Sequence, residues 1–390
     1  MKKNTIAIQS PFPHRDAYGA IAMPVYHTDA YEFDNATVMA DAFCGRINEP
    51  DYSRVTNPTV INFEERVKML TGARDVVAVN SGMAAISNTL MCLAAAGKNI
   101  VTSRHLFGNT YALISKTLAR FGVECRAVDL LDLEQVKAAI DENTCCLYFE
   151  IMTNPQLEVA DTRALSTIAH SHGVPVVADT TVIPFTEFNS HELGVDIEVV
   201  SSTKYISGGA TTVGGLIIDY GTVENFKDVM RRDILMNLGA YMTPHVAYMQ
   251  TLGLENLNAR YTLQSRNTLE LATRLRTLKA IKSVNYVGFE DNPFHEISVS
   301  QYGKTAGAMM TIDLENEQAC FDFLNKLKLV KRATNLFDNK TLAIHPASTI
   351  FGPFTAQQRA EMDILDTTIR LSIGLEDVDD IFEDIKQALE

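Results

Sequence analysis

The chain has 390 residues, of which 46% are hydrophobic and 21% charged, so it has ample material for a buried core and little room for disorder. Its 34 Lys and Arg residues against 48 Asp and Glu residues leave a formal net charge of −14. That acidity argues against binding nucleic acid or anionic lipid through diffuse positive charge, so an anionic ligand must meet a local positive site.

Several targeting and redox signals are missing from the sequence. No apolar run approaches the roughly 20 residues that a membrane helix needs. The basic start at residues 1–5 is not followed by the apolar segment of a secretory signal. Six cysteines are scattered with spacings that fit neither a disulfide framework nor a zinc site. We therefore expect a cytoplasmic protein with reduced thiols and no metal site.

The N-terminal stretch of about 55 residues is polar and rich in turn residues, with little periodicity. Near its end, residues 52–59 read Tyr-Ser-Arg-Val-Thr-Asn-Pro-Thr. In an extended arm, Tyr52 and Arg54 can converge on one anion. A plain surface loop is the alternative interpretation of this segment.

Beyond residue 63, short apolar runs alternate with longer amphipathic stretches. The runs, rich in β-branched residues, lie at 76–79, 100–102, 124–128, 146–149, 175–178, 197–200 and 215–218. They predict βαβ units that form an α/β fold, with a mostly parallel sheet buried by helices on both faces. Ligands of such sheets bind beyond the carboxyl ends of the strands.

Two turns that follow predicted strands carry candidate ligand-binding groups. Residues 78–86 run from a strand through Ser81 and Gly82 into a helix, whose free N–H groups would attract a phosphate. Asp179 follows another strand, where a buried carboxylate needs a cation or donors and could pair with a protonated ring nitrogen. An ordinary capped turn and a helix N-cap remain the alternative interpretations.

Residues 199–209 form the sharpest motif and read Val-Val-Ser-Ser-Thr-Lys-Tyr-Ile-Ser-Gly-Gly. A strand ends, hydroxyl residues follow, and then come Lys204 and two glycines. Desolvation lowers the pKa of a lysine and makes its amine available for imine chemistry or as a base. A surface lysine in a loop would give the same spacing.

The pattern changes near residue 245 and predicts a smaller C-terminal α/β domain. A long helix, or two joined helices, is expected over 247–278. Further strands are expected at 307–314, 342–345 and 368–372, and further helices at 321–328, 355–364 and 376–389. Arg370 lies inside the last of these strands, and a buried arginine needs a carboxylate from either the protein or a ligand.

An imine-forming lysine, a phosphate cradle, a carboxylate for a ring nitrogen and an arginine for a carboxylate are the parts that pyridoxal 5′-phosphate (PLP) needs to act on an amino acid. These motifs, taken in their order along the chain, resemble those of the Cys/Met-metabolism family of fold-type I PLP enzymes. The resemblance runs from residues 19–26 to residues 370–377 and so covers nearly the whole chain. The resemblance implies a seven-stranded sheet sandwiched by helices. It also implies an N-terminal arm (1–60), a PLP-binding α/β domain (61–245) and a C-terminal α/β domain (246–390).

The resemblance also implies roles for individual residues. Lys204 would be the Schiff-base lysine, and Asp179 would hold the pyridinium nitrogen. The other cofactor contacts would come from Ser81, Gly82, Met83, Phe107, Asn154, Ser201, Thr203 and, from a neighbouring subunit, Tyr52 and Arg54. Arg370 would bind the α-carboxylate of the amino-acid substrate, and Asn335 would be a second substrate-binding residue. Because Tyr52 and Arg54 of the arm would contact the cofactor of a neighbouring subunit, the resemblance implies active sites shared between the two chains of a dimer, within a homotetramer.

Two pocket positions depart from the patterns of the family. Phe107 stands where many members have a tyrosine, so it can stack on a ring but cannot transfer a proton. Asn109 stands where the resembling motif of methionine γ-lyases has a cysteine. Thr180 and Gly209 also differ from the common residues, with effects that the sequence does not reveal.

Residues 335–349 carry the clue to the activity within the family. Asn335 and Lys340 resemble O-acetylhomoserine sulfhydrylases, whereas enzymes that form or cleave cystathionine have Ser and Glu there; Phe337 replaces a glycine. The resemblance implies replacement at the γ-carbon of an O-acylhomoserine, with O-acetyl-L-homoserine favoured, by sulfide or a small thiol, giving homocysteine or methionine. Methionine or cystathionine γ-lyase, cystathionine γ-synthase and O-succinylhomoserine sulfhydrylase remain alternatives.

Overall fold

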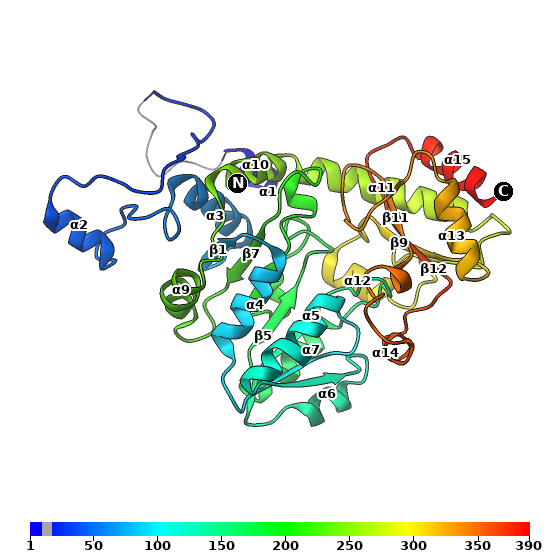
Figure 1. The fold of residues 1–390 in the computed structure, drawn as a ribbon, viewed down its shortest axis with the longest axis horizontal. Coiled ribbons are helices and arrows are strands. Elements are labelled where there is room, and N and C mark those ends of the chain that lie inside the picture. The colour runs from blue at the N-terminus through cyan, green and yellow to red at the C-terminus, as the bar shows by residue number, and fades with distance from the viewer. Residues whose placement is uncertain (10–17) are drawn as a thin grey trace.

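The computed structural model describes residues 1–9 and 18–390 and contains two β-sheets with helices packed around them (Figure 1). The larger sheet is built from β1 (Asp75–Val79), β2 (Asn99–Ser103), β3 (Glu124–Val128), β4 (Thr144–Glu150), β5 (Val176–Asp179), β6 (Ile197–Val200) and β7 (Gly215–Asp219). Its strand order is β1-β7-β6-β5-β4-β2-β3. Only β7 is antiparallel to its neighbours, which confirms the mostly parallel seven-stranded sheet.

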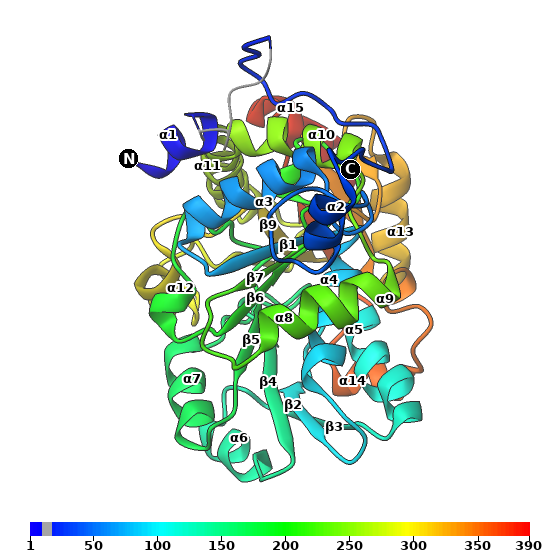
Figure 2. The ribbon, with the colours of Figure 1, turned by 90° about the vertical axis from the view of Figure 1, so that its left-hand side faces the viewer.

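Helices cover both faces of this sheet because its strands are apolar on both sides. Alternate side chains of one strand enter different cores: Val76 of β1 belongs to one buried cluster and Val77 to another. On one side lie α3 (Pro58–Thr71), α6 (Leu133–Ala139) and α7 (Thr162–Ser171), and on the other α4 (Gly82–Leu93), α5 (Gly108–Ala112) and α8 (Phe226–Asp228). The short helix α9 (Met236–Leu238) contains no buried residue. Figure 2 shows α7 and α4 on opposite sides of the strands.

The smaller sheet lies in the C-terminal part of the chain. Its strands, in the order β10-β11-β12-β9-β8, are β8 (Ser283–Asn285), β9 (Met309–Asp313), β10 (Lys331–Arg332), β11 (Leu342–Ile344) and β12 (Thr368–Ser372). The surrounding helices are α10 (Pro244–Glu255), α11 (Leu257–Leu275), α12 (His295–Tyr302), α13 (Glu317–Lys326), α14 (Ala356–Glu361) and α15 (Val378–Leu389). Of the two arrangements expected over 247–278, a long helix or two joined helices, the structure has two consecutive helices. The elements β8, β10 and α12 were not expected. The domain boundaries near residues 60 and 245 stay predictions.

The N-terminal part is more regular than its composition suggested, because it contains α1 (Lys3–Gln9) and α2 (Ala36–Phe43). Asn35 caps α2 by accepting hydrogen bonds from two backbone N–H groups at the helix start. α1 is held by tertiary contacts, since Arg66 donates to the Ala7 carbonyl. Residues 10–17, a part of the predicted arm, lie outside the described residues. None of the helices in the described ranges is long and apolar enough to cross a membrane.

Candidate active site

A cavity of about 470 Å³ lies beyond the carboxyl ends of β4, β5 and β6, and residues of the C-terminal part close one side of it. The position is the one expected for ligands of a parallel sheet. Most of the residues singled out from the sequence line this cavity: Ser81, Gly82, Met83, Phe107, Asn154, Asp179, Ser201, Thr203, Lys204, Asn335 and Arg370. The fold therefore brings together in one chain side chains that lie as much as 289 residues apart (370 − 81).

Lys204 reaches this cavity from the turn that follows β6. Its Nζ donates a hydrogen bond of 2.7 Å to Oδ1 of Asn335. Burial, followed by the charge of Arg370, lowers the pKa of Lys204 to about 8, while Asp179 opposes the shift. An amine with this pKa can both accept and release a proton near neutral pH.

Two carboxyl groups end neighbouring strands at the floor of the cavity. Glu150 of β4 is paired in register with Asp179 of β5. Burial raises the pKa of both groups, and the charge of Asp179 helps to raise the pKa of Glu150 to about 8. Asp179 accepts a hydrogen bond from the Thr181 backbone N–H at 2.9 Å. Burial disfavours the charged form of Asp179, and a cation held in the cavity would stabilise that form.

Sequence reasoning did not assign a role to Glu150, although it lies in the same stretch as Asn154 and directly follows the strand predicted at 146–149. Its Oε1 accepts a hydrogen bond from the Phe107 backbone N–H at 2.6 Å. Glu150 thereby fixes the backbone of the residue whose ring forms a wall of the cavity. A carboxyl group at the end of a buried strand was the signal that could have found it.

The start of α4 forms a cradle for an anion. Ser81 caps the helix by accepting a hydrogen bond from the Ala84 N–H, and the first N–H groups of a helix have no intrahelical partner. Gly82 is needed here because a Cβ at this position would lie 2.6 Å from the Ser201 Cβ. The Ser201 side chain thus lies directly against the helix N-terminus, where a phosphate is favoured.

Arg370 of β12 supplies the second positive charge of the cavity. It is 2% exposed, and burial lowers its pKa to about 9. Its guanidinium donates to Asn154 Oδ1 and to the carbonyls of Thr334 and Asn335, each at 3.1 Å. No salt bridge holds it among the described residues, and its Nε has no hydrogen-bond partner there. A buried guanidinium without a protein carboxylate is well suited to bind a ligand carboxylate.

Tyr52 and Arg54 do not line this cavity in their own chain. Arg54 donates a hydrogen bond to the Met236 carbonyl and lies 5.5 Å from the centre of the Tyr52 ring. Their predicted contact with the phosphate of a neighbouring subunit stays a prediction.

Residues 4–390 match the Cys/Met metabolism PLP-dependent enzyme family. An L-methionine gamma-lyase of Fusobacterium nucleatum is 37% identical over 380 residues, which cover 96% of this chain and 95% of the relative. The crystal structure of a putative O-acetylhomoserine (thiol)-lyase from Campylobacter jejuni, which contains a pyridoxyl-lysine phosphate, superposes with a TM-score of 0.96 at 31% identity and full coverage of both chains. The structure of an O-acetylhomoserine sulfhydrylase from Wolinella succinogenes is 42% identical, with a TM-score of 0.77 over 86% of this chain and 97% of the other.

Proposed function

Because the chain belongs to the Cys/Met metabolism family of PLP-dependent enzymes, we propose that it replaces the γ-substituent of an O-acylhomoserine with sulfide or a small thiol. The proposed substrate is O-acetyl-L-homoserine, and the products are homocysteine or methionine. The observation that carries the proposal is the contact between the Lys204 amine and Asn335, in a cavity whose only other cationic lining residue, within the described chain, is Arg370.

The residues of the cavity fit PLP. Ser201, Thr203 and the start of α4 would bind its phosphate, Asp179 its protonated ring nitrogen, and the Phe107 ring would stack on its ring. Within the described part of the chain, neither the buried carboxyl group of Asp179 nor the guanidinium of Arg370 forms a salt bridge, and cofactor and substrate would supply these partners. When bound, PLP supplies an electron sink that makes the protons on the carbons of an amino acid acidic.

Lys204 would carry the proton transfers. With its pKa at about 8, Nζ can take a proton from substrate carbon and return it. Asn335 accepts a hydrogen bond from this amine and so orients it. Phe107 has no hydroxyl, so the aromatic wall of the cavity cannot share in the proton transfers. Arg370 would bind the substrate α-carboxylate and fix which carbon faces Lys204.

The charges of the cavity favour a neutral acyl group. A succinyl or phosphate ester brings further negative charge into a site whose lining already includes Glu150 and Asp179. Lys204 and Arg370, its two cations, already have the roles described above. The remaining wall is largely apolar and includes Met83, Ile86, Val213, Leu336 and Ile350. An unpaired charge buried there would be costly, whereas an acetyl group would not.

We also propose that Tyr52 and Arg54 complete the cavity of a second copy of the chain, within a tetramer. The groups that this chain offers to a phosphate are neutral donors: two hydroxyls and the N–H groups of a helix start. A guanidinium from a second copy would balance the phosphate charge.

A substrate panel tests the proposal. O-acetyl-, O-succinyl- and O-phosphohomoserine are each offered with sulfide, methanethiol or cysteine, and all products are measured by mass. We expect kcat/KM for the acetyl ester with sulfide or methanethiol to exceed that for the succinyl ester at least about tenfold, since an unpaired buried charge costs more than about 1.4 kcal/mol. A preference for the succinyl ester, or for cysteine as nucleophile, would contradict it.

A γ-lyase acting on methionine is the second candidate, favoured by the 37% identity to an L-methionine gamma-lyase. Asn109 in the cavity lining and Lys340 favour the sulfhydrylase instead. Release of 2-oxobutyrate from methionine without added thiol, at a rate comparable to γ-replacement, would decide for the lyase.

A further inference from the structure

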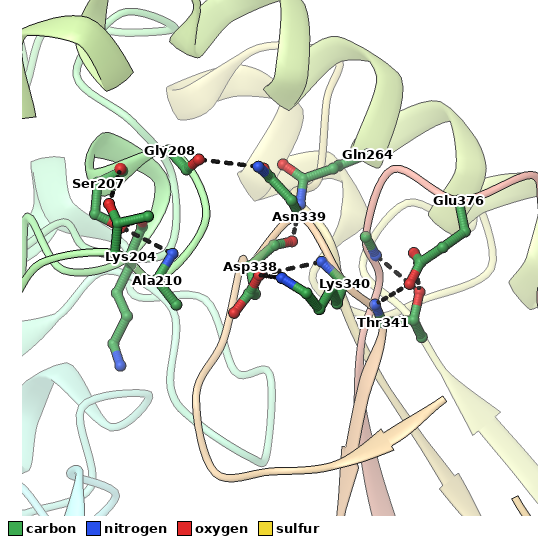
Figure 3. Close-up of polar contacts among 12 residues, drawn as sticks. Lys204, Ser207, Gly208, Ala210, Gln264, Asp338, Asn339, Lys340, Thr341 and Glu376 are labelled. Carbon is green, nitrogen blue, oxygen red and sulfur yellow. Dashed lines mark hydrogen bonds and ion pairs between the residues drawn. The ribbon is translucent and has the colours of Figure 1, made fainter. Parts of the chain in front are cut away.

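The segment of residues 334–341, here called the bridging segment, connects β10 to β11 and lies between the Lys204 turn and the end of β12. On the β12 side it is held at several points. The Phe337 backbone N–H donates to Ser372 Oγ at 2.6 Å, and the Leu375 N–H donates to the Asn339 carbonyl at 2.8 Å. Thr341 donates two hydrogen bonds to the Glu376 carboxylate (Figure 3).

On its other side, alternate residues of the bridging segment contact the Lys204 turn. Asn335 accepts the hydrogen bond from the Lys204 amine. The Phe337 ring stacks on the Tyr205 ring, with centroids 4.1 Å apart and planes 9° apart. Asn339 Nδ2 donates to the Gly208 carbonyl at 2.9 Å, as Figure 3 shows. The stack therefore lies between two polar contacts and next to the lysine itself.

Tyr205 is a rigid surface for this stack. Its hydroxyl accepts a hydrogen bond from the Ala308 N–H at 3.0 Å, and its ring packs edge-on against Tyr261 with centroids 5.1 Å apart. A ring that packs against Tyr205 is thus fixed relative to the backbone of the adjacent Lys204.

The backbone of Phe337 is strained. Its φ is +56°, in the left-handed region that residues other than glycine seldom adopt, at a cost of about 1 kcal/mol or more. The side chain is 1% exposed. A glycine would adopt this φ freely but could not stack. The strain is therefore sustained by the packing of the ring, and it occurs two residues from the group that contacts Lys204.

We propose that Phe337 is a positioning residue for Lys204: stacked on Tyr205, it holds the Asn335 carboxamide against the lysine amine. The same segment offers the carbonyls of Thr334 and Asn335 to Arg370, so it sets the geometry between the two cations of the cavity. The proposal deepens the proposed function, because it rests on the role of Lys204 there. If Phe337 only filled space in the core, any side chain of similar volume would serve equally well.

The test compares Phe337→Leu with the unmodified full-length chain, both freed of PLP. Leucine keeps the apolar volume and the same backbone penalty but cannot stack. The Lys204 amine is labelled with trace acetic anhydride over a range of pH, and the Lys204 peptide is quantified by mass. Release of the bridging segment would admit water, so we expect the labelling midpoint to rise from about 8 by about one pH unit. In the PLP-loaded enzyme, kcat should fall about tenfold or more with little change in KM.

Two further variants keep the test decisive. Phe337→Gly relieves the backbone strain and serves if the leucine variant does not fold; it should shift the midpoint in the same direction. Tyr205→Phe loses the hydroxyl bond to Ala308 but keeps the stack and the edge-on packing against Tyr261, so its midpoint should shift less than that of Phe337→Leu. A folded Phe337→Leu or Phe337→Gly chain with an unshifted midpoint overturns the proposal, as does an equal shift in Tyr205→Phe. Labelling uses no substrate, so its result stands whether or not γ-replacement is observed.

Discussion

The cavity and the N-terminal arm differ in how their side chains are held: those of the cavity have partners within the chain, whereas apolar side chains of the arm are exposed. Residues that line the cavity are held by contacts within one chain, as in the hydrogen bonds of Lys204 to Asn335 and of Arg370 to Asn154. The arm exposes apolar side chains instead: Ile21 is 97% exposed and Phe43 on α2 is 58% exposed. In Figure 1 the arm with α2 extends away from the rest of the fold.

The comparison separates the roles that a single chain can fulfil from those that need a second copy. The cavity has its cations, its carboxyl groups and its helix N-terminus in place without help from another molecule. Tyr52 and Arg54 do not reach the cavity of their own chain, and exposed apolar side chains favour a surface that another copy covers. A substitution in the cavity should therefore impair the active site of the chain that carries it, whereas a substitution in the arm should impair the active site of another copy.

The largest effect is expected for Lys204→Ala. Loss of the amine that lines the cavity should lower turnover at least about a thousandfold and remove the visible absorbance of bound PLP. Lys204→Arg keeps the charge and is the matched control, with the same expected loss. Borohydride treatment of the unmodified enzyme followed by peptide mapping should place the label on the fragment that contains Lys204. A label on another fragment would refute the assignment.

Arg370→Ala should have the next largest effect. It removes the charge expected to bind the substrate carboxylate. Loss of this contact should cost about 3 kcal/mol, which lowers kcat/KM roughly a hundredfold. Arg370→Lys keeps a charge but loses the forked geometry and should recover only a part of the rate. PLP absorbance should persist in both variants, and kcat/KM for the amino-acid substrate is the measurement. A kcat/KM unchanged in Arg370→Ala would be incompatible with this role.

Arg54→Ala tests the arm. If Arg54 acts in the site of a neighbouring copy, the variant should bind PLP about tenfold more weakly, since a lost charged hydrogen bond is worth about 1.5–3 kcal/mol. At a PLP concentration too low to saturate Arg54→Ala, Lys204→Ala and Arg54→Ala chains that are unfolded and refolded together should then show more activity per Arg54→Ala chain than that variant has alone, because some mixed sites contain both native residues. Failure of the mixture to regain activity, with mixed oligomers demonstrated, would assign Arg54 to its own chain.

The smallest effect is expected for Glu150→Gln. Burial raises the pKa of Glu150 to about 8, so the folded chain holds a proton that the unfolded chain releases above about pH 4.3. The Glu150 contribution to stability is thus lost as pH rises toward 8. The substituted carboxamide could not ionise yet would still accept the Phe107 N–H, so the unfolding temperature of the variant should fall less between about pH 5 and pH 8. An identical pH dependence in both chains would exclude this role of Glu150.

Much of the fold was predictable because the strands of the large sheet are continuous apolar runs. The run at 197–200 coincides with β6, and the run at 215–218 covers all of β7 except its last residue. The errors arose where periodicity is weak and tertiary contacts decide. β10 has two exposed residues, and α1 depends on contacts such as that between Arg66 and the Ala7 carbonyl. α13 begins at Glu317, four residues before the expected position, because Asn316 caps it.

Four kinds of chemical group could be identified from the amino-acid sequence: one lysine after a buried strand, a serine-glycine helix start, a carboxyl group at a strand end and an arginine inside a strand. Those features are local, so residue type and spacing reveal them. Three contacts became known only from the folded chain: Asn335 accepts a hydrogen bond from the Lys204 amine, Glu150 accepts one from the Phe107 backbone, and Phe337 stacks on Tyr205. These contacts join segments 131, 43 and 132 residues apart, and chain packing, rather than local pattern, brings such segments together.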